Sequence, residues 1–376
     1  MITNPFIYLF SLAFIATFFY LLESKTDFKF LKYIPAVVLI YAFSMIFASL
    51  GMFESNEAIN HIYKTTKSNL LPAMLFLMLL QVDLKHFLKL GKKLLVSYLL
   101  AVSSIGLAFI LTALLFHFST DMSGAFGALA GSWMGGTANM IAVGSALNVS
   151  EEAFAYALVV DSVNYTLWVM LLLFLVPFAH IFNKFTKAQT NASNLSEVGC
   201  ACSLGVKRYW QLILLALFVS FLSQYLSTQF IILNSTTTVV IVATLFGIIA
   251  SFTKLRELNG SNEVATSMLY IIIALIGSKA VIESFDAVGK YVLAGFVILL
   301  MHAFFMVVGA KLFKLDLFSI SVASLANIGG VASAPILAAM YNKNLIGVGV
   351  LMAIMGYIIG TFGGLAVGNI LQLLSS

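Results

Sequence analysis

Residues 124–147, GAFGALAGSWMGGTANMIAVGSAL, form an apolar segment that a double glycine interrupts at its middle. Residues 318–341, FSISVASLANIGGVASAPILAAMY, repeat this arrangement around Gly329 and Gly330. Because glycine loses more backbone freedom in a helix than other residues, each pair predicts two half-helices joined by an irregular turn. Hydrocarbon cannot satisfy bare backbone groups, so such a turn needs a covering of protein or a watery cavity. Broken helices at corresponding places in two halves are typical of the substrate site of a secondary transporter.

The composition is that of a polytopic membrane protein. Of the 376 residues, 61% are hydrophobic and only 9% are charged, and the mean hydropathy is +1.04. These values exclude a soluble globular domain and a disordered chain. The net charge of +5 does not indicate a nucleic acid partner, because the basic residues lie in short loops between apolar segments, where they orient a membrane protein.

Apolar runs divide the chain into two similar halves. About 20 apolar residues cross the ~30 Å hydrocarbon core of a bilayer. Runs of roughly this length occur at 6–22, 35–52, 69–82, 94–118, 152–178, 209–228, 235–252, 264–281, 290–313 and 345–373. The polar connector 183–208 separates a first half, 1–182, from a second half, 209–376. Each half holds five of these runs and one broken segment, in the same order.

Loop charge distinguishes two topologies. If every segment crossed the membrane from an outside amino terminus, the basic connector 183–208 would lie outside, against the positive-inside rule. If each broken segment is a re-entrant hairpin, the basic loops become cytoplasmic, and the acidic loops and both termini face out. Five spans per half then give the second half the opposite orientation. The prediction is an all-α membrane protein of two inverted repeats of five transmembrane helices, with re-entrant hairpins at 124–147 and 318–341.

Two motifs carry a resemblance to a known family. With GSWMGGTANM at 131–140 and ANIGG at 326–330, nearly the whole chain resembles the YjcL-like family of uncharacterised bacterial membrane proteins. More distantly, its layout is similar to that of glutamate:sodium and 2-hydroxycarboxylate symporters. The resemblance implies an elevator-type transporter, often a homodimer, that is coupled to Na⁺ or H⁺. Those symporters bind carboxylate through an arginine, whereas Arg208 and Arg256 lie at segment edges here, which argues against a citrate-like substrate.

The hairpin tips are the predicted binding site. The residues predicted to bind substrate are Trp133, Gly135, Gly136, Thr137 and Asn139 in the first tip and Asn327, Gly329, Gly330 and Ser333 in the second. Half-helix ends direct free N–H groups toward anions and free carbonyls toward cations, and the neutral oxygens of Asn139 and Ser324 suit Na⁺. The alternative is a close helix contact through small residues, and for Trp133 simple packing. The last-span glycines Gly356, Gly360, Gly363 and Gly364 are interpreted chiefly as such contacts.

Two ionisable residues lie deep within predicted spans. A carboxylate at the depth of Asp161 costs ~2.5–3.5 kcal/mol, so we interpret Asp161 as a Na⁺ ligand or proton carrier, with Asn164 on the same helical face. The alternative is a structural hydrogen bond to a neighbouring helix. His302 is a second candidate for proton coupling, although a neutral histidine bonded to a backbone carbonyl is the ordinary expectation. Pairing the two halves places Ser104 opposite His302.

The sequence therefore predicts a secondary active transporter that moves a small polar or anionic organic solute with Na⁺ or H⁺. Its expected partners are the lipid bilayer of the cytoplasmic (inner) membrane, the solute, the coupling cation and a second copy of the chain. No enzyme motif such as a phosphate loop or HExxH is present, and no cofactor is expected. Asp161 keeps a Na⁺/H⁺-type cation exchanger as an alternative. A third hypothesis, a non-transporting receptor or scaffold, would not explain why the chain has two broken segments.

Overall fold

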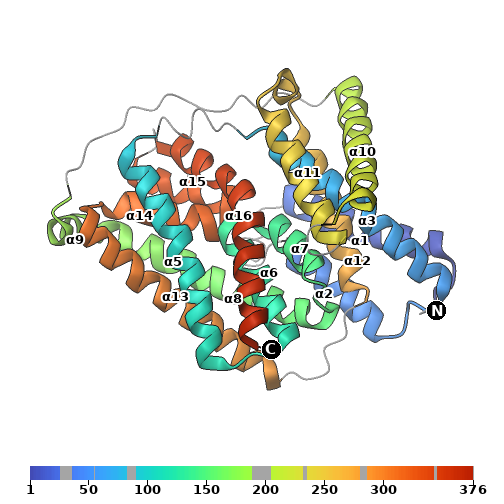
Figure 1. The fold of residues 1–376 in the computed structure, drawn as a ribbon, viewed down its shortest axis with the longest axis horizontal. Coiled ribbons are helices and arrows are strands. Elements are labelled where there is room, and N and C mark those ends of the chain that lie inside the picture. Colours follow the sequence, from blue (N-terminus) through green and yellow to red (C-terminus); the bar gives the residue numbers. More distant parts are fainter. Residues whose placement is uncertain are drawn as a thin grey trace. The chain divides into compact units, whose positions relative to one another are not determined.

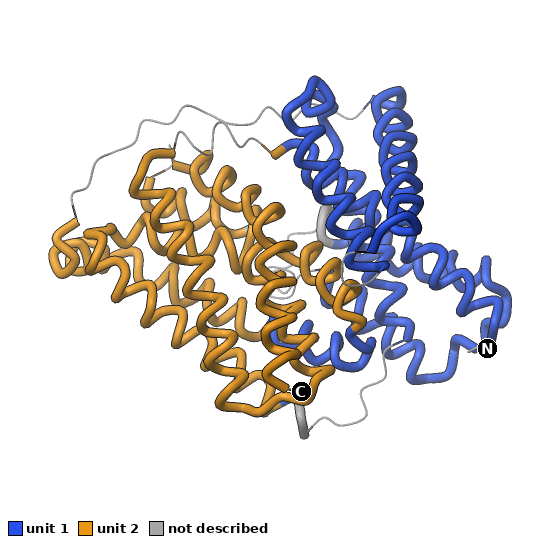
Figure 2. Tube along the Cα trace, in the orientation of Figure 1, with its two compact units in different colours: residues 1–81, 149–162, 202–288 blue, residues 82–148, 163–201, 289–376 orange. Residues whose placement is uncertain are grey.

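The helices of the computed structural model form two compact units (Figures 1 and 2). Unit 1 comprises residues 1–81, 149–162 and 202–288, and unit 2 comprises residues 82–148, 163–201 and 289–376. Each unit therefore takes helices from both halves of the chain. The structure describes residues 1–25, 36–54, 56–82, 90–188, 205–231, 235–279, 286–342 and 345–375. Within these ranges every element is helical, apart from an isolated bridge between Ile2 and Phe53.

Unit 1 is built around α3. Its elements are α1 (Pro5–Lys25), α2 (Ala36–Ser49), α3 (Glu57–Leu80), the first part of α8 (Glu151–Leu175), α10 (Val206–Gln229), α11 (Ser235–Ser251), the 3-10 helix η3 (Lys254–Glu257) and α12 (Ser261–Gly277). The apolar residues 71–80 of α3 are all buried, because α10, α11 and α12 pack around this helix. α1 and α2 pack on each other and on α12.

α3 begins earlier than its apolar run predicts. The run starts at residue 69, whereas the helix starts at Glu57. Asn56 caps the helix, because its side-chain oxygen accepts a hydrogen bond of 2.8 Å from the N–H of Ile59. Polar residues such as Lys64 and Lys67 lower the hydropathy of the first three turns, so an apolar run does not include them, although they are compatible with a helix.

Unit 2 holds both broken segments. Its elements are α5 (Lys92–Phe116), α6 (Thr120–Gly135), α7 (Thr137–Ala146), the second part of α8, the 3-10 helix η2 (Val176–Phe178), α9 (Ala179–Thr186), most of α13 (Asp286–Phe313), α14 (Leu317–Ile328), α15 (Gly330–Tyr341) and α16 (Ile346–Ser375). α16 packs against α6, α15, α14, α7 and α5, so it is the central helix of this unit.

Each double glycine interrupts its helix, as predicted. Gly136 separates α6 from α7 with a φ of +91°, and Gly330 opens α15 with a φ of +59°. Glycine adopts such angles at less cost than a residue with a side chain. The break in the second segment is made by its glycines and not by Pro335, because Pro335 lies within α15.

In both segments the second helix folds back along the first. In the first, α6 and α7 meet side by side: a Cβ atom added at Gly131 would lie 2.9 Å from the side chain of Val143, 12 residues further along the chain. In the second, the rings of Phe318 and Tyr341 at the outer ends of α14 and α15 lie 5.4 Å apart. A straight helix would place either pair more than 15 Å apart, at ~1.5 Å of rise per residue.

The chain is a membrane protein with several apolar helices. Six helices in the described residues are long and apolar enough to cross a bilayer, namely those at 5–22, 92–116, 151–186, 206–229, 288–313 and 346–375. The described parts of α2, α11 and α12 have 14, 17 and 17 residues, shorter than the ~20 residues that span hydrocarbon. The predicted total of ten spans and the opposite orientation of the two halves stay predictions.

Candidate functional site

The first broken segment is held against α16 by glycine. Three glycines on one face of α6 meet three on α16 in antiparallel order, namely Gly127 with Gly368, Gly131 with Gly364, and Gly135 with Gly360. A Cβ atom added at Gly364 would lie 2.6 Å from the Cα of Gly131, and one added at Gly360 would lie 2.7 Å from the Cα of Gly135. The two backbones therefore touch, and the predicted close helix contacts of the last span are confirmed.

Asn139 fastens this tip to α16. Its Nδ2 donates to the carbonyl oxygens of Gly135, at 2.8 Å, and of Gly356, at 3.3 Å. Its Oδ1 accepts a 2.7 Å hydrogen bond from the Thr361 hydroxyl. Asn139 is buried, and these bonds satisfy both the nitrogen and the oxygen of its amide. One lone pair of Oδ1 is left, which a cation could use. The helix contact explains the surroundings of Asn139, and its role as an ion ligand stays a prediction.

The other residues of the first tip differ in accessibility. Trp133 is fully buried, and its ring meets that of Phe109 edge to face at 5.4 Å between centroids. This arrangement agrees with the packing alternative for Trp133. Gly136 and Thr137 are half-buried, and Gly136 faces the ring of Tyr357. The accessible part of this tip is therefore the turn itself.

The second tip holds buried oxygen atoms that have no protein partner. Asn327 is fully buried, and its Nδ2 donates to the carbonyl of Ala323 at 2.8 Å, while its Oδ1 accepts no hydrogen bond. The hydroxyl of Ser333 is also buried without a partner, and it lies next to Gly329. A buried polar group without a partner costs about 1–3 kcal/mol, and native structures satisfy nearly all such groups. A ligand with hydrogen-bond donors or a cation would satisfy both oxygens.

The α8 helix contributes an aromatic ring to this tip. A Cβ atom added at Gly329 would lie 2.7 Å from Cε2 of Tyr165, so this ring packs directly against the glycine. Sequence reasoning did not identify Tyr165 or Trp168. The signal was present, because Asp161, Tyr165 and Trp168 follow the spacing of one helical face.

His302 stands at the centre of a buried hydrogen-bond network that joins three helices to α14. Its Nδ1 lies 2.7 Å from the hydroxyl of Ser104, and its Nε2 lies 2.8 Å from the hydroxyl of Ser324. The Ser104 hydroxyl also donates to the carbonyl of Ala101 at 2.8 Å, and Trp168 Nε1 donates to Ser324 at 2.9 Å. Both ring nitrogens of His302 therefore meet serine hydroxyls and not the backbone carbonyl that was the ordinary expectation, and one of these serines, Ser104, is the residue that corresponds to His302 in the other half.

The donors of this network determine the tautomer of His302. The single hydroxyl hydrogen of Ser104 points to a backbone carbonyl, so we infer that His302 Nδ1–H donates to Ser104. Nε2 is then an acceptor, which receives the hydroxyl hydrogen of Ser324, while Ser324 in turn accepts from Trp168. Every member is satisfied with a neutral imidazole. Proton transport by His302 would require the Ser324 hydroxyl to turn away, and it stays a prediction.

We expect Ser324→Ala to lower the free energy of unfolding by about 1–3 kcal/mol, because the variant leaves Trp168 Nε1–H and His302 Nε2 buried without partners. Ser223→Ala is the matched control. Ser223 is buried on α10, and its hydroxyl has no hydrogen-bond partner, so its removal should be neutral or slightly stabilising. Detergent unfolding of the two purified variants compares these costs. Equal destabilisation by both variants would contradict the network.

Asp161 and Asn164 lie on adjacent turns of α8. Asn164 is fully buried, and its Nδ2 donates to the carbonyl of Val292 on α13 at 3.2 Å. Asp161 is half-buried, and within the six candidate spans it is the one carboxylate away from a helix end. In the described residues no three His, Cys, Asp or Glu side chains gather as a metal site. Cation binding by Asp161, Asn164 and Ser324 stays a prediction.

Fold and site together define an all-helical membrane protein with two broken helix pairs in one of its two compact units. The chain belongs to the DUF819 family of proteins of unknown function, whose family model matches residues 10–374. It is 24% identical over 379 aligned residues to the uncharacterized membrane protein YjcL of Bacillus subtilis (strain 168), and the alignment covers 91% of each chain. The resemblance to the YjcL-like family is therefore confirmed.

Proposed function

We propose that this protein is a secondary active transporter for a small polar or anionic organic solute, not an enzyme. The observation that carries the proposal is the presence of two glycine-broken helix pairs within one compact unit. Irregular backbone at membrane depth is tolerated only where it is covered by protein or lines a watery cavity. Two such breaks at corresponding places are the pattern of transporter substrate sites.

Two further features support inverted repeats. In unit 2 the order α5, α6, α7, α8 is matched by α13, α14, α15, α16, and in unit 1 α1 to α3 are matched by α10 to α12. Ser104 and His302, which correspond in the two halves, lie 2.7 Å apart. Equivalent residues of two symmetric repeats touch only near the axis that relates them. In this proposal each broken pair is a re-entrant hairpin, and both termini lie outside the cytoplasmic membrane.

In this proposal the two units have different roles in transport. Unit 2 carries both hairpins and would move across the membrane as one body, as an elevator mechanism requires. Unit 1 would then be the stationary frame and would supply the contact in a homodimer. The close glycine packing of α6 on α16 supports this proposal, because it makes the hairpin and the central helix of unit 2 a single rigid element.

The second tip indicates the chemistry of the solute. The free acceptors there, Asn327 Oδ1 and Ser333 Oγ, suit a solute that carries hydroxyl or amino hydrogens. The half-helix α15 begins at this tip, and its free N–H groups suit a negative group. Neither arginine of the chain lies in a hairpin, so a carboxylate would be held by backbone groups and not by a bidentate side chain.

We expect Na⁺ to raise the melting temperature of the purified protein relative to K⁺ at equal ionic strength. A ligand that binds only the folded state adds about 2.7 kcal/mol at a hundred times its dissociation constant. Asp161→Asn should abolish the difference between the two ions. Asp121→Asn is the matched control, because Asp121 is exposed in the first turn of α6, and it should retain the difference.

The outcomes separate the coupling ions. Equal melting temperatures in Na⁺ and K⁺ would contradict Na⁺ coupling and leave H⁺, which a pH series on wild type and Asp161→Asn then tests. If Asp161→Asn kept the difference in melting temperature between Na⁺ and K⁺, the role of Asp161 would be contradicted but Na⁺ coupling would not. A panel of small amino, hydroxy and carboxy solutes, screened in the same assay, tests the solute class.

A Na⁺/H⁺-type cation exchanger is the second candidate, because Asp161 is the one carboxylate deep in a candidate span. Proteoliposomes that contain a pH-sensitive dye distinguish it from a symporter. An exchanger moves protons when Na⁺ is added without any organic solute. A symporter shows no such proton movement.

A further inference from the structure

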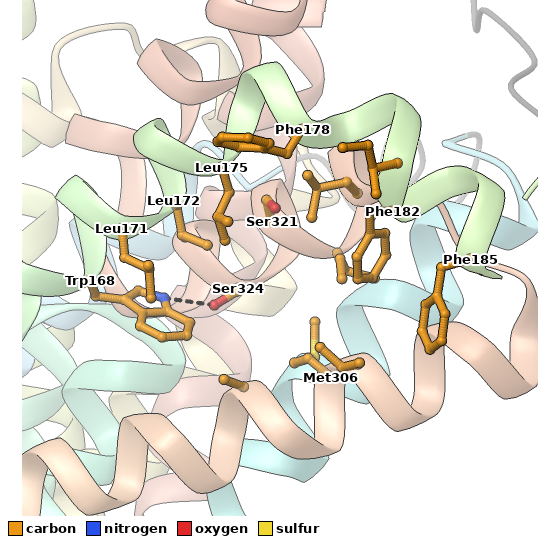
Figure 3. Close-up of a pocket in the computed structure, with 15 residues that line it drawn as sticks. Trp168, Leu171, Leu172, Leu175, Phe178, Phe182, Phe185, Met306, Ser321 and Ser324 are labelled. Atoms are coloured by element: carbon orange, nitrogen blue, oxygen red, sulfur yellow. Dashed lines mark hydrogen bonds between the residues drawn. The ribbon is translucent and has the colours of Figure 1, made fainter.

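An apolar cavity of about 520 Å³ lies within unit 2, between the second part of α8, α9, α13 and α14 (Figure 3). All but two of its 15 lining residues are apolar, and the two exceptions are Ser321 and Ser324. Cavities of 300–1,000 Å³ with a mostly apolar lining are typical of sites for small molecules and cofactors. The polar solute of the proposed transport does not suit this lining, because its hydrogen-bonding groups would be buried without partners.

The cavity reaches the outer surface of unit 2. Its lining residues Phe178, Ile181 and Phe185 are exposed large apolar side chains on η2 and α9. In a membrane protein such a surface contacts lipid. The short α9 also carries the exposed Lys184, so one side is apolar and the end is basic, as in helices that lie at a membrane interface. Lipid chains can therefore reach the cavity from the bilayer.

A basic group stands at one end of the cavity. Lys311 Nζ lies 4.2 Å from the centre of the Phe185 ring, which lines the cavity, and it also donates to the Phe185 carbonyl. Lys311 is exposed, as are Lys184 and Lys314 at the adjacent ends of α9 and α13. The nearby carboxylate of Asp316 is occupied in capping α14, where it accepts from the N–H of Ser319 at 2.8 Å.

Contacts hold the cavity open at this end. Asn183 Oδ1 accepts a 2.8 Å hydrogen bond from the N–H of Leu317, which ties α9 to the start of α14. Together with the contact between Lys311 and Phe185, this bond fixes α9 to both neighbouring helices. The side chains of Phe182 and Phe185 therefore form a wall opposite Met306 (Figure 3).

We propose that this cavity holds one acyl chain of an anionic phospholipid, whose phosphate lies against Lys311. The apolar lining takes the chain, and basic pockets at the ends of membrane helices are known to bind anionic headgroups. Four residues of α14 line the cavity, and the first and last of them, Leu317 and Ser324, are about 10 Å apart along the helix at ~1.5 Å of rise per residue. The chain is thus buried along the outer helix of the second broken pair.

Quenching of tryptophan by brominated lipid tests the acyl chain. The variant Trp133→Phe with Trp210→Phe keeps Trp168 alone, which lines the cavity and is only 5% exposed. Phosphatidylglycerol with brominated chains should quench Trp168 in a saturable manner. Ala303→Phe, which fills the cavity, should abolish the quenching. Ala366→Phe, on the exposed face of α16, should leave it unchanged.

Charge substitutions test the headgroup. Lys311→Gln should weaken binding of phosphatidylglycerol about fivefold, the equivalent of the ~1 kcal/mol that a basic residue contributes near an anionic lipid. Lys290→Gln, at the other end of α13, is the control and should have no effect. Native mass spectrometry measures how much phosphatidylglycerol the protein retains. It uses the chain with its tryptophans intact and so does not depend on the single-tryptophan variant.

Three outcomes would overturn the proposal. Trp168 emission that brominated phosphatidylglycerol leaves unchanged excludes an acyl chain in the cavity. Quenching that persists in Ala303→Phe places the lipid elsewhere. Equal binding of phosphatidylcholine and phosphatidylglycerol, or equal retention by Lys311→Gln and wild type, excludes the phosphate contact.

Discussion

We expect Gly364→Ala to lower the free energy of unfolding by about 3 kcal/mol, the upper range for overfilling a packed interior. A Cβ atom at this position would lie 2.6 Å from the Cα and 2.9 Å from the backbone nitrogen of Gly131. Neither atom belongs to a flexible side chain, so α6 and α16 must separate. Unfolding of the purified variant in mixed detergent micelles gives the free energy directly. Gly364 is not a predicted binding residue, so the measurement addresses the fold alone.

Gly289→Ala is the matched control for this substitution. Gly289 lies in the first turns of α13, and a Cβ atom added there would meet no atom within 4 Å. Alanine in an open helical position is favoured over glycine by about 0.5–1 kcal/mol, so this variant should be slightly more stable than wild type. If Gly364→Ala unfolded like Gly289→Ala, the close approach of α6 and α16 would be wrong.

The breaks in the two glycine-containing segments could be predicted because they depend on local chemistry. The double glycines at 135–136 and 329–330 predicted a break in each segment, and Gly136 and Gly330 both have a positive φ there. Double glycine alone does not decide this, because Gly363 and Gly364 lie inside the unbroken helix α16. The repeat in the sequence identified Ser104 and His302 as corresponding positions, whereas the hydrogen bond between them is seen only in the structure. The last-span glycines followed from the preference of membrane helices for small residues at their contacts.

Other features could not be predicted because they depend on partners distant in the sequence. Nothing near Asn139 in the sequence identifies Thr361 as its hydrogen-bond partner. Trp168 on an apolar helix looks like a packing residue until Ser324 is found beside it. The helix α9 follows Pro177 and has no apolar run of its own, so the sequence pattern places its last residues in the connector 183–208. The division into two units also depends on packing between the halves of the chain.

Substitution by leucine should affect the free energy of unfolding very differently at the two tip asparagines, Asn139 and Asn327. We expect Asn139→Leu to lower the free energy of unfolding by about 3 kcal/mol or more. The variant leaves the Thr361 hydroxyl and the Gly356 carbonyl buried without the Asn139 amide, at about 1–3 kcal/mol for each group. Asn327→Leu should cost only about 1 kcal/mol, because it removes a single hydrogen bond, from Nδ2 to the Ala323 carbonyl, and the lost oxygen has no protein partner.

The effect of Asn327→Leu should appear in solute binding and not in the stability of the protein alone. If Asn327 Oδ1 is an acceptor kept free for solute, Asn327→Leu should lose the stabilisation that a bound solute gives to wild type, although the variant itself folds normally. A hydrogen bond to a charged ligand contributes about 1.5–3 kcal/mol, which corresponds to a loss of affinity of roughly 10- to 100-fold. Thermal melting of wild type and Asn327→Leu against the same solute panel measures both quantities. Destabilisation of Asn327→Leu as severe as that of Asn139→Leu would mean that Oδ1 has a protein partner, and the second tip would then be packed interior and not a binding site.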